Sequence, residues 1–325
     1  MANADWTIAL HGGAGPLIVP EVLTELDAKM EEALQVCFAS IEGAKDGMDV
    51  VVAGLAHLEE CELFDCGYGS LIRDDGSVHL DVSLVDGQGS FFAIAGLEKM
   101  YYPSRLALHL LRENKGSMFT WYGEHVRNIV DGLSKEQKAA IGIVPNHAAM
   151  RAPFAKEYLD GITQRNTGKK LGGTVGCVVR DPSGRVFVGT STGGTPFAPV
   201  GRIGDTPVIG MGSFADDAIA GISATGFGEA FMSSASVPFV AAKLQGRAIS
   251  GSLELVEIID EEITRLERRF PGVEAGMIAV TKNGCVASAH NTELMPVAIG
   301  KGDVGCYSKI VCKNGVLSRD ALGAS

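Results

Sequence analysis

A threonine flanked by glycines, in the middle of the chain, has a sequence context that could support nucleophilic catalysis. Thr174 follows Gly172 and Gly173 and precedes the strand-like segment 175–180. A backbone cut before Thr174 would leave an N-terminal threonine, whose α-amine, with a pKa of about 8, could accept the proton of its own hydroxyl. One residue would then supply nucleophile and base. Taken alone, Thr174 also fits an ordinary β-branched residue at the start of a strand.

Other common catalytic signatures are absent from the sequence, which contains no P-loop, H-E-x-x-H motif or paired C-x-x-C site. The seven histidines are scattered singly, so spacing alone assembles neither a metal site nor a Ser/His pair. The loop His11–Gly15 could otherwise cradle a phosphate, but it lacks the P-loop lysine and does not fit G-x-G-x-x-G.

Several motifs in order extend along nearly the whole chain. The first half carries HGGAG at 11–15, LEECELF at 58–64 and LDVSLVDG at 80–87. The second half carries TVG at 174–176, TSTGG at 190–194, GRIGDTP at 201–207 and ATGFGE at 224–229. In these motifs and their spacing the chain resembles the plant-type L-asparaginase and isoaspartyl peptidase family of N-terminal nucleophile (Ntn) hydrolases.

The resemblance implies the catalytic roles. Thr174 would attack a side-chain amide or isopeptide carbonyl and form an acyl-enzyme. Thr192 would orient this nucleophile through a hydrogen bond. Thr225 and the N–H of Gly226 would form the oxyanion hole, where fixed donors stabilise charge that develops only in the transition state.

The resemblance also implies the substrate. Arg202 would bind the α-carboxylate, and Asp205, with the carbonyl of Gly228, would bind the α-ammonium. Flanking glycines at 201 and 204 favour a recognition turn over a surface ion pair between Arg202 and Asp205. The expected substrates are L-asparagine and β-aspartyl dipeptides, both of which have these two groups beside the scissile amide.

Further expectations concern processing and ions. Autocleavage between Gly173 and Thr174 would divide a single domain, 1–325, into an α-subunit (1–173) and a β-subunit (174–325), with 150–173 as a mobile linker. His11, Gly12 and Gly13 would support the cleavage, and no cofactor would be required. Backbone carbonyls of one loop could hold a structural Na⁺, a hard cation that carbonyl oxygens suit. The loop residues are Leu58, Glu59, Cys61, Phe64, Cys66 and Tyr68.

The sequence departs from the family pattern close to the expected site. Asp65 stands where asparagine is usual, within the substrate-binding region. An ionised carboxylate cannot donate a hydrogen bond and would oppose a developing oxyanion. Cys66 replaces a usual alanine, and Phe227 occupies a position that is commonly polar. The chain could therefore be an uncleaved, weakly active or inactive homologue that binds an aspartyl ligand, or an enzyme like glycosylasparaginase or threonine aspartase.

Hydrophobic periodicity predicts the elements that position these residues. Helices are expected at 20–44, 50–61, 104–113, 123–133, 228–244 and 252–268. Strands are expected at 6–10, 78–84, 91–97, 175–180, 185–190, 207–211, 220–224, 276–281 and 286–290. Grouped hairpins argue against a doubly wound parallel sheet. The predicted class is α+β, a four-layer αββα sandwich of the Ntn-hydrolase type with two stacked, mainly antiparallel sheets between helix layers.

Composition sets the expected partners. The formal charge of -11 comes from dispersed acidic residues and argues against a nucleic-acid or membrane surface. The polar N-terminus and seven irregularly spaced cysteines predict a cytoplasmic protein with reduced thiols. A small-molecule substrate and a homodimer of αβ units are expected.

Overall fold

The computed structural model describes residues 5–15, 20–113, 117–153, 173–302 and 308–311. Strands of the larger sheet come from both halves of the sequence, in the order β12-β11-β1-β5-β6-β2-β3-β4. Their bounds are Thr7–His11 (β1), Leu80–Asp86 (β2), Phe91–Leu97 (β3), Met118–Trp121 (β4), Val175–Arg180 (β5), Val186–Thr192 (β6), Pro296–Lys301 (β11) and Ser308–Val311 (β12). All neighbours are antiparallel except β3 and β4.

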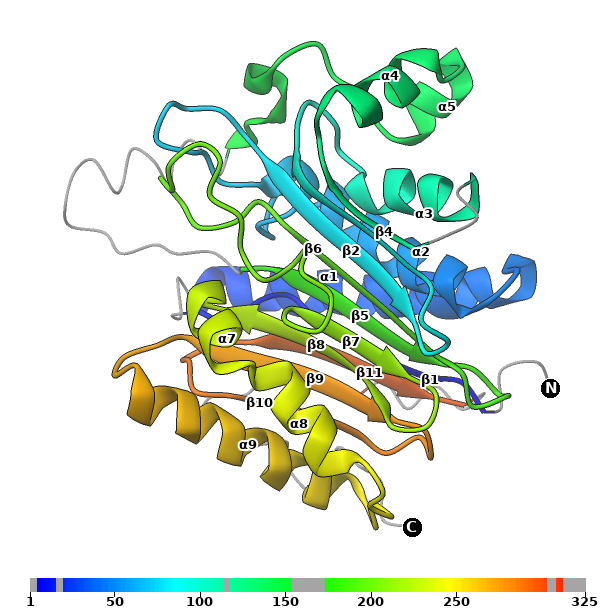
Figure 1. Ribbon diagram of the computed structural model, residues 1–325, viewed down its shortest axis with the longest axis vertical. Coiled ribbons are helices and arrows are strands. Elements are labelled where there is room, and N and C mark those ends of the chain that lie inside the picture. Colours follow the sequence, from blue (N-terminus) through cyan, green and yellow to red (C-terminus); the bar gives the residue numbers. More distant parts are fainter. Residues whose placement is uncertain (1–4, 16–19, 114–116, 154–172, 303–307, 312–325) are drawn as a thin grey trace.

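A smaller antiparallel sheet, in the order β10-β9-β8-β7, packs against the larger one. Its strands are Ser213–Asp216 (β7), Ala220–Gly226 (β8), Ala275–Thr281 (β9) and Val286–His290 (β10). Strands β5 and β6 contact β8, and β1 contacts β9 (Figure 1). The expectation of two mainly antiparallel, stacked sheets is confirmed.

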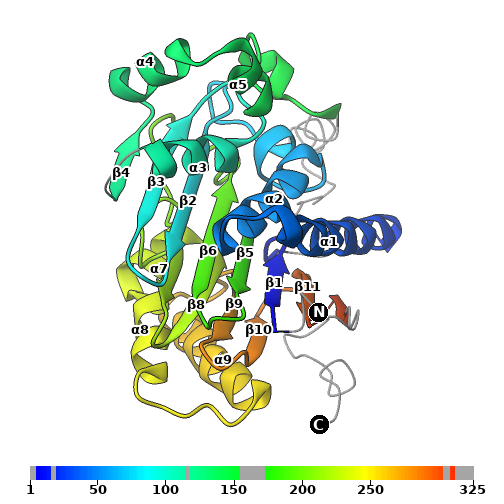
Figure 2. The same ribbon diagram turned by 90° about the vertical axis from the view of Figure 1, so that its right-hand side faces the viewer.

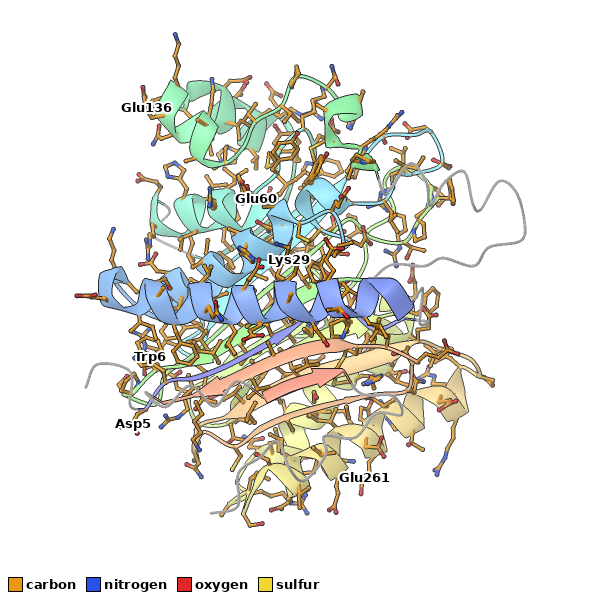
Figure 3. The ribbon with its side chains drawn as sticks, turned by 180° about the vertical axis from the view of Figure 1, so that it is seen from behind. Asp5, Trp6, Lys29, Glu60, Glu136 and Glu261 are labelled. Carbon is orange, nitrogen blue, oxygen red and sulfur yellow. The ribbon has the colours of Figure 1, made fainter. Side chains whose placement is uncertain are left out.

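Helices cover the outer face of each sheet. Their bounds are Pro20–Ser40 (α1), Gly47–Glu60 (α2), Pro103–Glu113 (α3), Glu124–Gly132 (α4), Lys135–Ala140 (α5), Gly228–Ser234 (α7), Ser236–Leu244 (α8) and Ser252–Arg269 (α9). Helices α1, α2 and α3 contact the larger sheet, whereas α8 and α9 contact the smaller one (Figure 2). Figure 3 shows Lys29 on α1 near the middle of the view and Glu261 on α9 at its lower edge, with strands between the two helices.

The residues of β5 pack into two different cores, one on each face of the larger sheet. Cys177 and Val179 pack into the core between the larger sheet and α1–α3. Val178, between them, packs into the core shared by the two sheets and α8–α9. Successive strand residues point to opposite faces, so a sheet covered on both sides needs apolar residues at nearly every position.

Local chemistry fixes several element ends. Asp46 caps α2 by accepting a hydrogen bond from the N–H of Met48 at 3.0 Å. Asp181 accepts hydrogen bonds from the N–H groups of Ser183 and Arg185, both at 2.9 Å, and so closes the expected turn between β5 and β6. This hairpin carries Thr174 at its beginning and Thr192 at its end.

Two expected elements are wrong. The segment 207–211 forms turns rather than a strand, since Gly210 has a φ of +87° and the N–H of Met211 bonds to the carbonyl of Val208. The expected helix 228–244 is divided at Ala235, which has a φ of +48°. Pro238 explains the break, because it has no N–H for the carbonyl of Ser234. That carbonyl accepts a hydrogen bond from Arg265 instead.

The expected mobile linker, 150–173, falls mostly outside the described residues, which omit 154–172. Its first part is packed, because Met150 and Ala152 are fully buried. Among the described residues, the helices are too short or too polar to cross a lipid bilayer.

Candidate active site

One cavity of about 660 Å³ brings together most of the residues that the sequence predicts for catalysis and substrate binding. Its lining includes Thr174, Thr192 and Gly226 from the catalytic set and Asp65, Arg202 and Asp205 from the binding set. Gly173 also lines the cavity, so the expected scissile bond lies at its surface. These residues are up to 161 positions apart, from Asp65 to Gly226, and only the stacking of the two sheets joins them.

The two hydroxyls of Thr174 and Thr192 meet because β5 and β6 are antiparallel neighbours. Val175 pairs with Ser191, so Thr174 lies beside the last residue of β6. The Thr174 hydroxyl donates to Thr192 Oγ at 3.1 Å, and the N–H of Gly194 donates to the same oxygen at 3.0 Å. Thr192 Oγ is therefore fixed as the acceptor of the expected nucleophile's proton.

Thr225 and Gly226 end β8, and the Thr225 hydroxyl lies beside Gly173, just before β5. The N–H of Ala14 donates to Thr225 Oγ at 3.2 Å, which leaves the Thr225 O–H available as a donor. Gly226 has a φ of +129°, and a Cβ there would lie 2.8 Å from the carbonyl carbon of Glu274. This position requires glycine, which agrees with the expected use of its backbone N–H.

The loop after β1 touches the expected cleavage point through its backbone. Gly13 has a φ of +101°, and a Cβ on it would lie 2.6 Å from the Cα and 2.7 Å from the carbonyl carbon of Gly173. Gly12 faces the ring of Phe64 in the same way. Gly13 therefore allows two backbone segments to approach more closely than any side chain would permit.

His11 lies behind this contact rather than in the cavity. Its Nε2 is 2.8 Å from Ser223 Oγ, and its ring is fully buried. Burial lowers the pKa of His11 to about 3, although the Thr174 backbone opposes this shift. His11 is neutral at physiological pH and supports the strand that carries Thr174.

Arg202 is held by Glu229 and not by Asp205. Its Nε and Nη2 donate to the two carboxylate oxygens of Glu229 at 2.8 and 2.6 Å. The Arg202 side chain keeps 16% of its surface exposed, and it lines the cavity. This bidentate pair fixes the plane of the guanidinium and leaves its Nη1 edge for a ligand.

Asp205 is a buried carboxylate beside Gly228. A Cβ on Gly228 would lie 2.5 Å from Asp205 Oδ1, so a glycine is needed there. Burial raises the pKa of Asp205 to about 6, an effect that the nearby Arg202 charge opposes. At neutral pH a cationic ligand would find this carboxylate largely ionised.

Asp65 lines the cavity within a crowded cluster of buried charges. Its Oδ1 accepts the N–H of Leu71 at 2.9 Å. Burial raises the pKa of Asp65 to about 7, against the Leu71 hydrogen bond and the charges of Arg73 and Arg202. Asp81, also buried, has a raised pKa for the same main reason. A protonated Asp65 can donate a hydrogen bond as asparagine does.

The Leu58–Tyr68 segment surrounds two glycines with carbonyl oxygens. A Cβ on Gly69 would collide with the carbonyls of Phe64 and Cys61, and a Cβ on Gly67 with that of Glu59. The carbonyls of Leu58 and Cys66 accept N–H groups within the loop, and Tyr68 makes an edge-to-face contact with Tyr101. The segment thus contains backbone carbonyl oxygens, the kind of ligand that a hard cation accepts.

The Glu59 side chain is hydrogen-bonded to Ser104. It is fully buried and accepts the N–H and hydroxyl of Ser104 at 3.1 and 2.7 Å. Burial raises the pKa of Glu59 to about 7. Within the described part of the chain, side chains of His, Cys, Asp and Glu form no group of three that could hold a metal ion.

Sequence reasoning missed three contributors to the site. Glu229 lies 27 positions from its partner Arg202, and no periodicity connects them. Arg73 is only 1% exposed and lies against Gly194, under the cavity. The third is the loop 270–274, which reaches the cavity from the end of α9. Only the charge of Glu229, next to Gly228 in a matched motif, could have drawn attention to it.

Comparison with known proteins gives consistent matches. A family model described as Asparaginase matches residues 4–306. The isoaspartyl peptidase of Salmonella typhimurium is 30% identical over 302 residues, covering 90% of this chain and 94% of that protein. A probable isoaspartyl peptidase/L-asparaginase 2 of Arabidopsis thaliana is 30% identical, covering 89% and 94%. The plant-type L-asparaginase of Pyrobaculum calidifontis is 29% identical, covering 91% and 97%.

Proposed function

The chain belongs to the asparaginase family, and from this premise we propose that it hydrolyses L-asparagine and β-aspartyl dipeptides with Thr174 as nucleophile. One observation carries the proposal: the Thr174 hydroxyl is hydrogen-bonded to Thr192 in a cavity that Arg202 and Asp205 also line. A nucleophile with a fixed hydrogen-bond acceptor thus shares one cavity with a cation and an anion. An aspartyl group with free α-amine and α-carboxylate matches this arrangement.

The enzyme becomes active by cleaving its own backbone between Gly173 and Thr174, into subunits of residues 1–173 and 174–325. Thr174 Oγ attacks the carbonyl carbon of Gly173, the C–N bond breaks, and the resulting ester is hydrolysed by water. Contact of Gly13 with Gly173 supports this step, because it restricts the scissile peptide. Thr225 Oγ supports it too, lying 3.5 Å from the position that a Cβ of Gly173 would take.

In the processed enzyme the free α-amine of Thr174 accepts the proton of Thr174 Oγ during attack on the substrate's side-chain carbonyl. The O–H of Thr225 and the N–H of Gly226 donate to the oxyanion. The leaving amine departs with the proton as the C–N bond breaks. Water then attacks the aspartyl ester and restores Thr174.

Substrate selection follows from charge. The Nη1 edge of Arg202 binds the α-carboxylate, and Asp205 with the Gly228 carbonyl binds the α-ammonium. Buried ionic contacts of this kind discriminate strongly, because a ligand that lacks either group leaves a buried charge unpaired.

Three finer features belong to the same proposal. The layers are those of the four-layer αββα Ntn-hydrolase sandwich, supported by the contacts of α1–α3 and α8–α9 with opposite sheets. A structural Na⁺ binds the Leu58–Tyr68 carbonyls, of which those of Glu59, Cys61 and Phe64 converge on two glycines. Two αβ units form a homodimer, which analytical ultracentrifugation would measure.

The test combines processing with turnover. Purified protein is followed by intact mass and denaturing gel electrophoresis, and ammonia release from asparagine is measured in parallel with β-aspartyl dipeptide cleavage. We expect two bands, and two intact masses that match residues 1–173 and 174–325. Turnover should appear as the cleavage proceeds. A single uncut chain that binds aspartate without turnover would support the inactive-homologue alternative. Preference for glycosylated asparagine or a protein substrate would identify one of the related enzymes.

A further inference from the structure

The cavity has two chemically different sides. The polar side is formed by the residues that hold an aspartyl group, Thr174, Thr192, Arg202 and Asp205. The other group of lining residues, here called the apolar wall, consists of Phe227, which is hydrogen-bonded to the 270–274 loop, and of Phe270, Pro271 and Val273 in that loop. The mechanism above gives the apolar wall no role.

The apolar wall is built into the site. The N–H of Phe227 donates to the carbonyl of Glu274 at 2.9 Å, which ties it to the 270–274 loop. The N–H of Val273 donates to the carbonyl of Phe270 at 3.0 Å, and Phe270 packs against the core between the sheets and α9. Phe227 follows the oxyanion glycine directly and still keeps 46% of its surface exposed. A large apolar side chain in this position has surface available for a ligand.

The cavity is larger than asparagine needs. Its volume of about 660 Å³ equals the share of about 20 liquid water molecules, whereas asparagine has about nine non-hydrogen atoms. Binding of the aspartyl group on the polar side leaves room for a second residue. Because the oxyanion donors and the charged residues fix the aspartyl group, the leaving residue must extend into the space that remains, beside the apolar wall.

We propose that the apolar wall binds the side chain of the residue released from a β-aspartyl dipeptide and favours apolar and aromatic leaving residues. This inference rests on the proposed function and specifies its substrate class. Burial of an apolar side chain against Phe227, Phe270 and Val273 removes both surfaces from water. The two charged residues at this side have opposite signs, Arg269 and Glu274, so they give no net preference for a charged leaving residue.

Arg269, beside the apolar wall, makes contacts with other residues of the protein. Its guanidinium lies 5.2 Å from the ring centre of Phe270, and its Nη1 donates to Ser234 Oγ at 3.3 Å. These contacts give the guanidinium partners on Phe270 and Ser234 within the protein.

The experiment measures kcat/KM of the processed enzyme for β-aspartyl-phenylalanine, β-aspartyl-glycine and asparagine. We expect the phenylalanine dipeptide to exceed the glycine dipeptide about tenfold, the discrimination that a modest apolar pocket gives. In Phe227→Ser this ratio should fall to about threefold or less, because the exposed aromatic ring of the wall is lost. Phe119→Ser is the matched control, since Phe119 is 52% exposed on β4 and does not line the cavity. It should keep the wild-type ratio.

The outcomes separate the two claims. Equal kcat/KM for the two dipeptides in the wild-type enzyme would overturn the apolar wall's role and leave the proposed function standing. No turnover of asparagine or either dipeptide by processed protein would overturn the proposed function itself. If Phe227→Ser does not fold, the ratio of kcat/KM for the two dipeptides in the wild-type enzyme still tests the role of the apolar wall. An equal loss of the ratio in Phe119→Ser would also count against the wall.

Discussion

Thr174 and Thr192 lie with their hydroxyl oxygens 3.1 Å apart, and Thr174 is the donor. Since Gly194 also donates to Thr192, the Thr192 oxygen accepts two hydrogen bonds and positions the proton of Thr174. The pair exists because β5 begins where β6 ends. We expect it to govern both self-cleavage and substrate hydrolysis, since the same hydroxyl attacks in each reaction.

Removing the nucleophile should stop both reactions. Thr174→Ala is expected to remain one chain and to lose turnover by on the order of 10⁴-fold or more, as when other hydrolases lose their nucleophile. Thr174→Ser, which keeps a hydroxyl, should still be cut at a reduced rate. Intact mass and ammonia release check both variants. Normal cleavage in Thr174→Ala would refute the mechanism.

Thr192→Ala should slow cleavage and turnover without preventing folding. Loss of a hydrogen bond to the reacting hydroxyl costs about 1–3 kcal/mol, so rates should fall about 10- to 100-fold. Thr192→Ser keeps the acceptor oxygen and should stay close to the wild type. Single-turnover rates measure the effect, and a circular dichroism spectrum checks the fold. An equal loss in both variants would mean that the methyl group, not the hydroxyl, matters.

Gly13→Ala should impair self-cleavage, because its methyl group would collide with the backbone of Gly173 and the residue has a positive φ. Gly43→Ala is the control, since a Cβ there meets nothing within 4 Å. We expect slow or absent cleavage only in Gly13→Ala, followed by denaturing gels over time. Wild-type cleavage in that variant would show that the Gly13–Gly173 contact is dispensable.

Asp65→Asn should change the pH profile. Burial raises the pKa of Asp65 to about 7, so the wild-type carboxyl is neutral and can donate below that pH, and it ionises above it. The activity ratio of Asp65→Asn to wild type should therefore rise as the pH increases from 6 to 8, on the order of tenfold if the charge opposes the oxyanion. Paired kcat/KM profiles test this. A ratio that is flat or falls with pH would contradict it.

The same substitution makes a prediction about stability. A carboxyl whose folded pKa lies above its unfolded value stabilises the fold fully below the unfolded pKa, and this contribution is lost as pH rises to the folded pKa. Asp65→Asn should thus gain stability relative to the wild type between about pH 4 and 7. Urea midpoints across this range measure the gain.

Glu229→Gln should weaken substrate binding. The bidentate pair with Arg202 orients the guanidinium, and its loss leaves Arg202 facing the buried carboxylates of Asp205 and Asp81. We expect KM to rise about tenfold with a smaller change in kcat, as when an interaction made equally in ground and transition states is lost. Glu261→Gln, whose exposed carboxylate pairs with Lys243, is the control. A fall in kcat alone would argue against a binding role.

Much of the fold could be predicted from the sequence. Apolar runs bounded by turn residues reveal β1, α2 and the β5–β6 hairpin, which are buried almost throughout, and the helical period reveals α9, which has one buried face. The short edge strand β4, with Phe119 and Trp121 exposed, has no such pattern. The break at Ala235 depends on the effect of Pro238 four residues after Ser234, a local conflict that an apolar run conceals.

The candidate site was predictable to the extent that its motifs are contiguous. The sequence motifs identify Thr174, Thr192, Arg202 and Asp205, and all four line one cavity. Their partners depend on tertiary packing. The pairing of Arg202 with Glu229, the burial of Arg73 and the approach of the 270–274 loop follow from how the sheets stack, which no local pattern encodes.

The strand order has a further consequence. Strands β11, β12, β5 and β6 follow Thr174 in the chain, whereas β1, β2, β3 and β4 precede it. In the larger sheet β1 lies between β11 and β5, and β6 is bonded to β2. After a cut, strands of the two pieces therefore alternate within the larger sheet and are hydrogen-bonded to each other. Neither piece can leave without breaking ladders on both sides of β1, so the cut chain stays one particle until it is denatured.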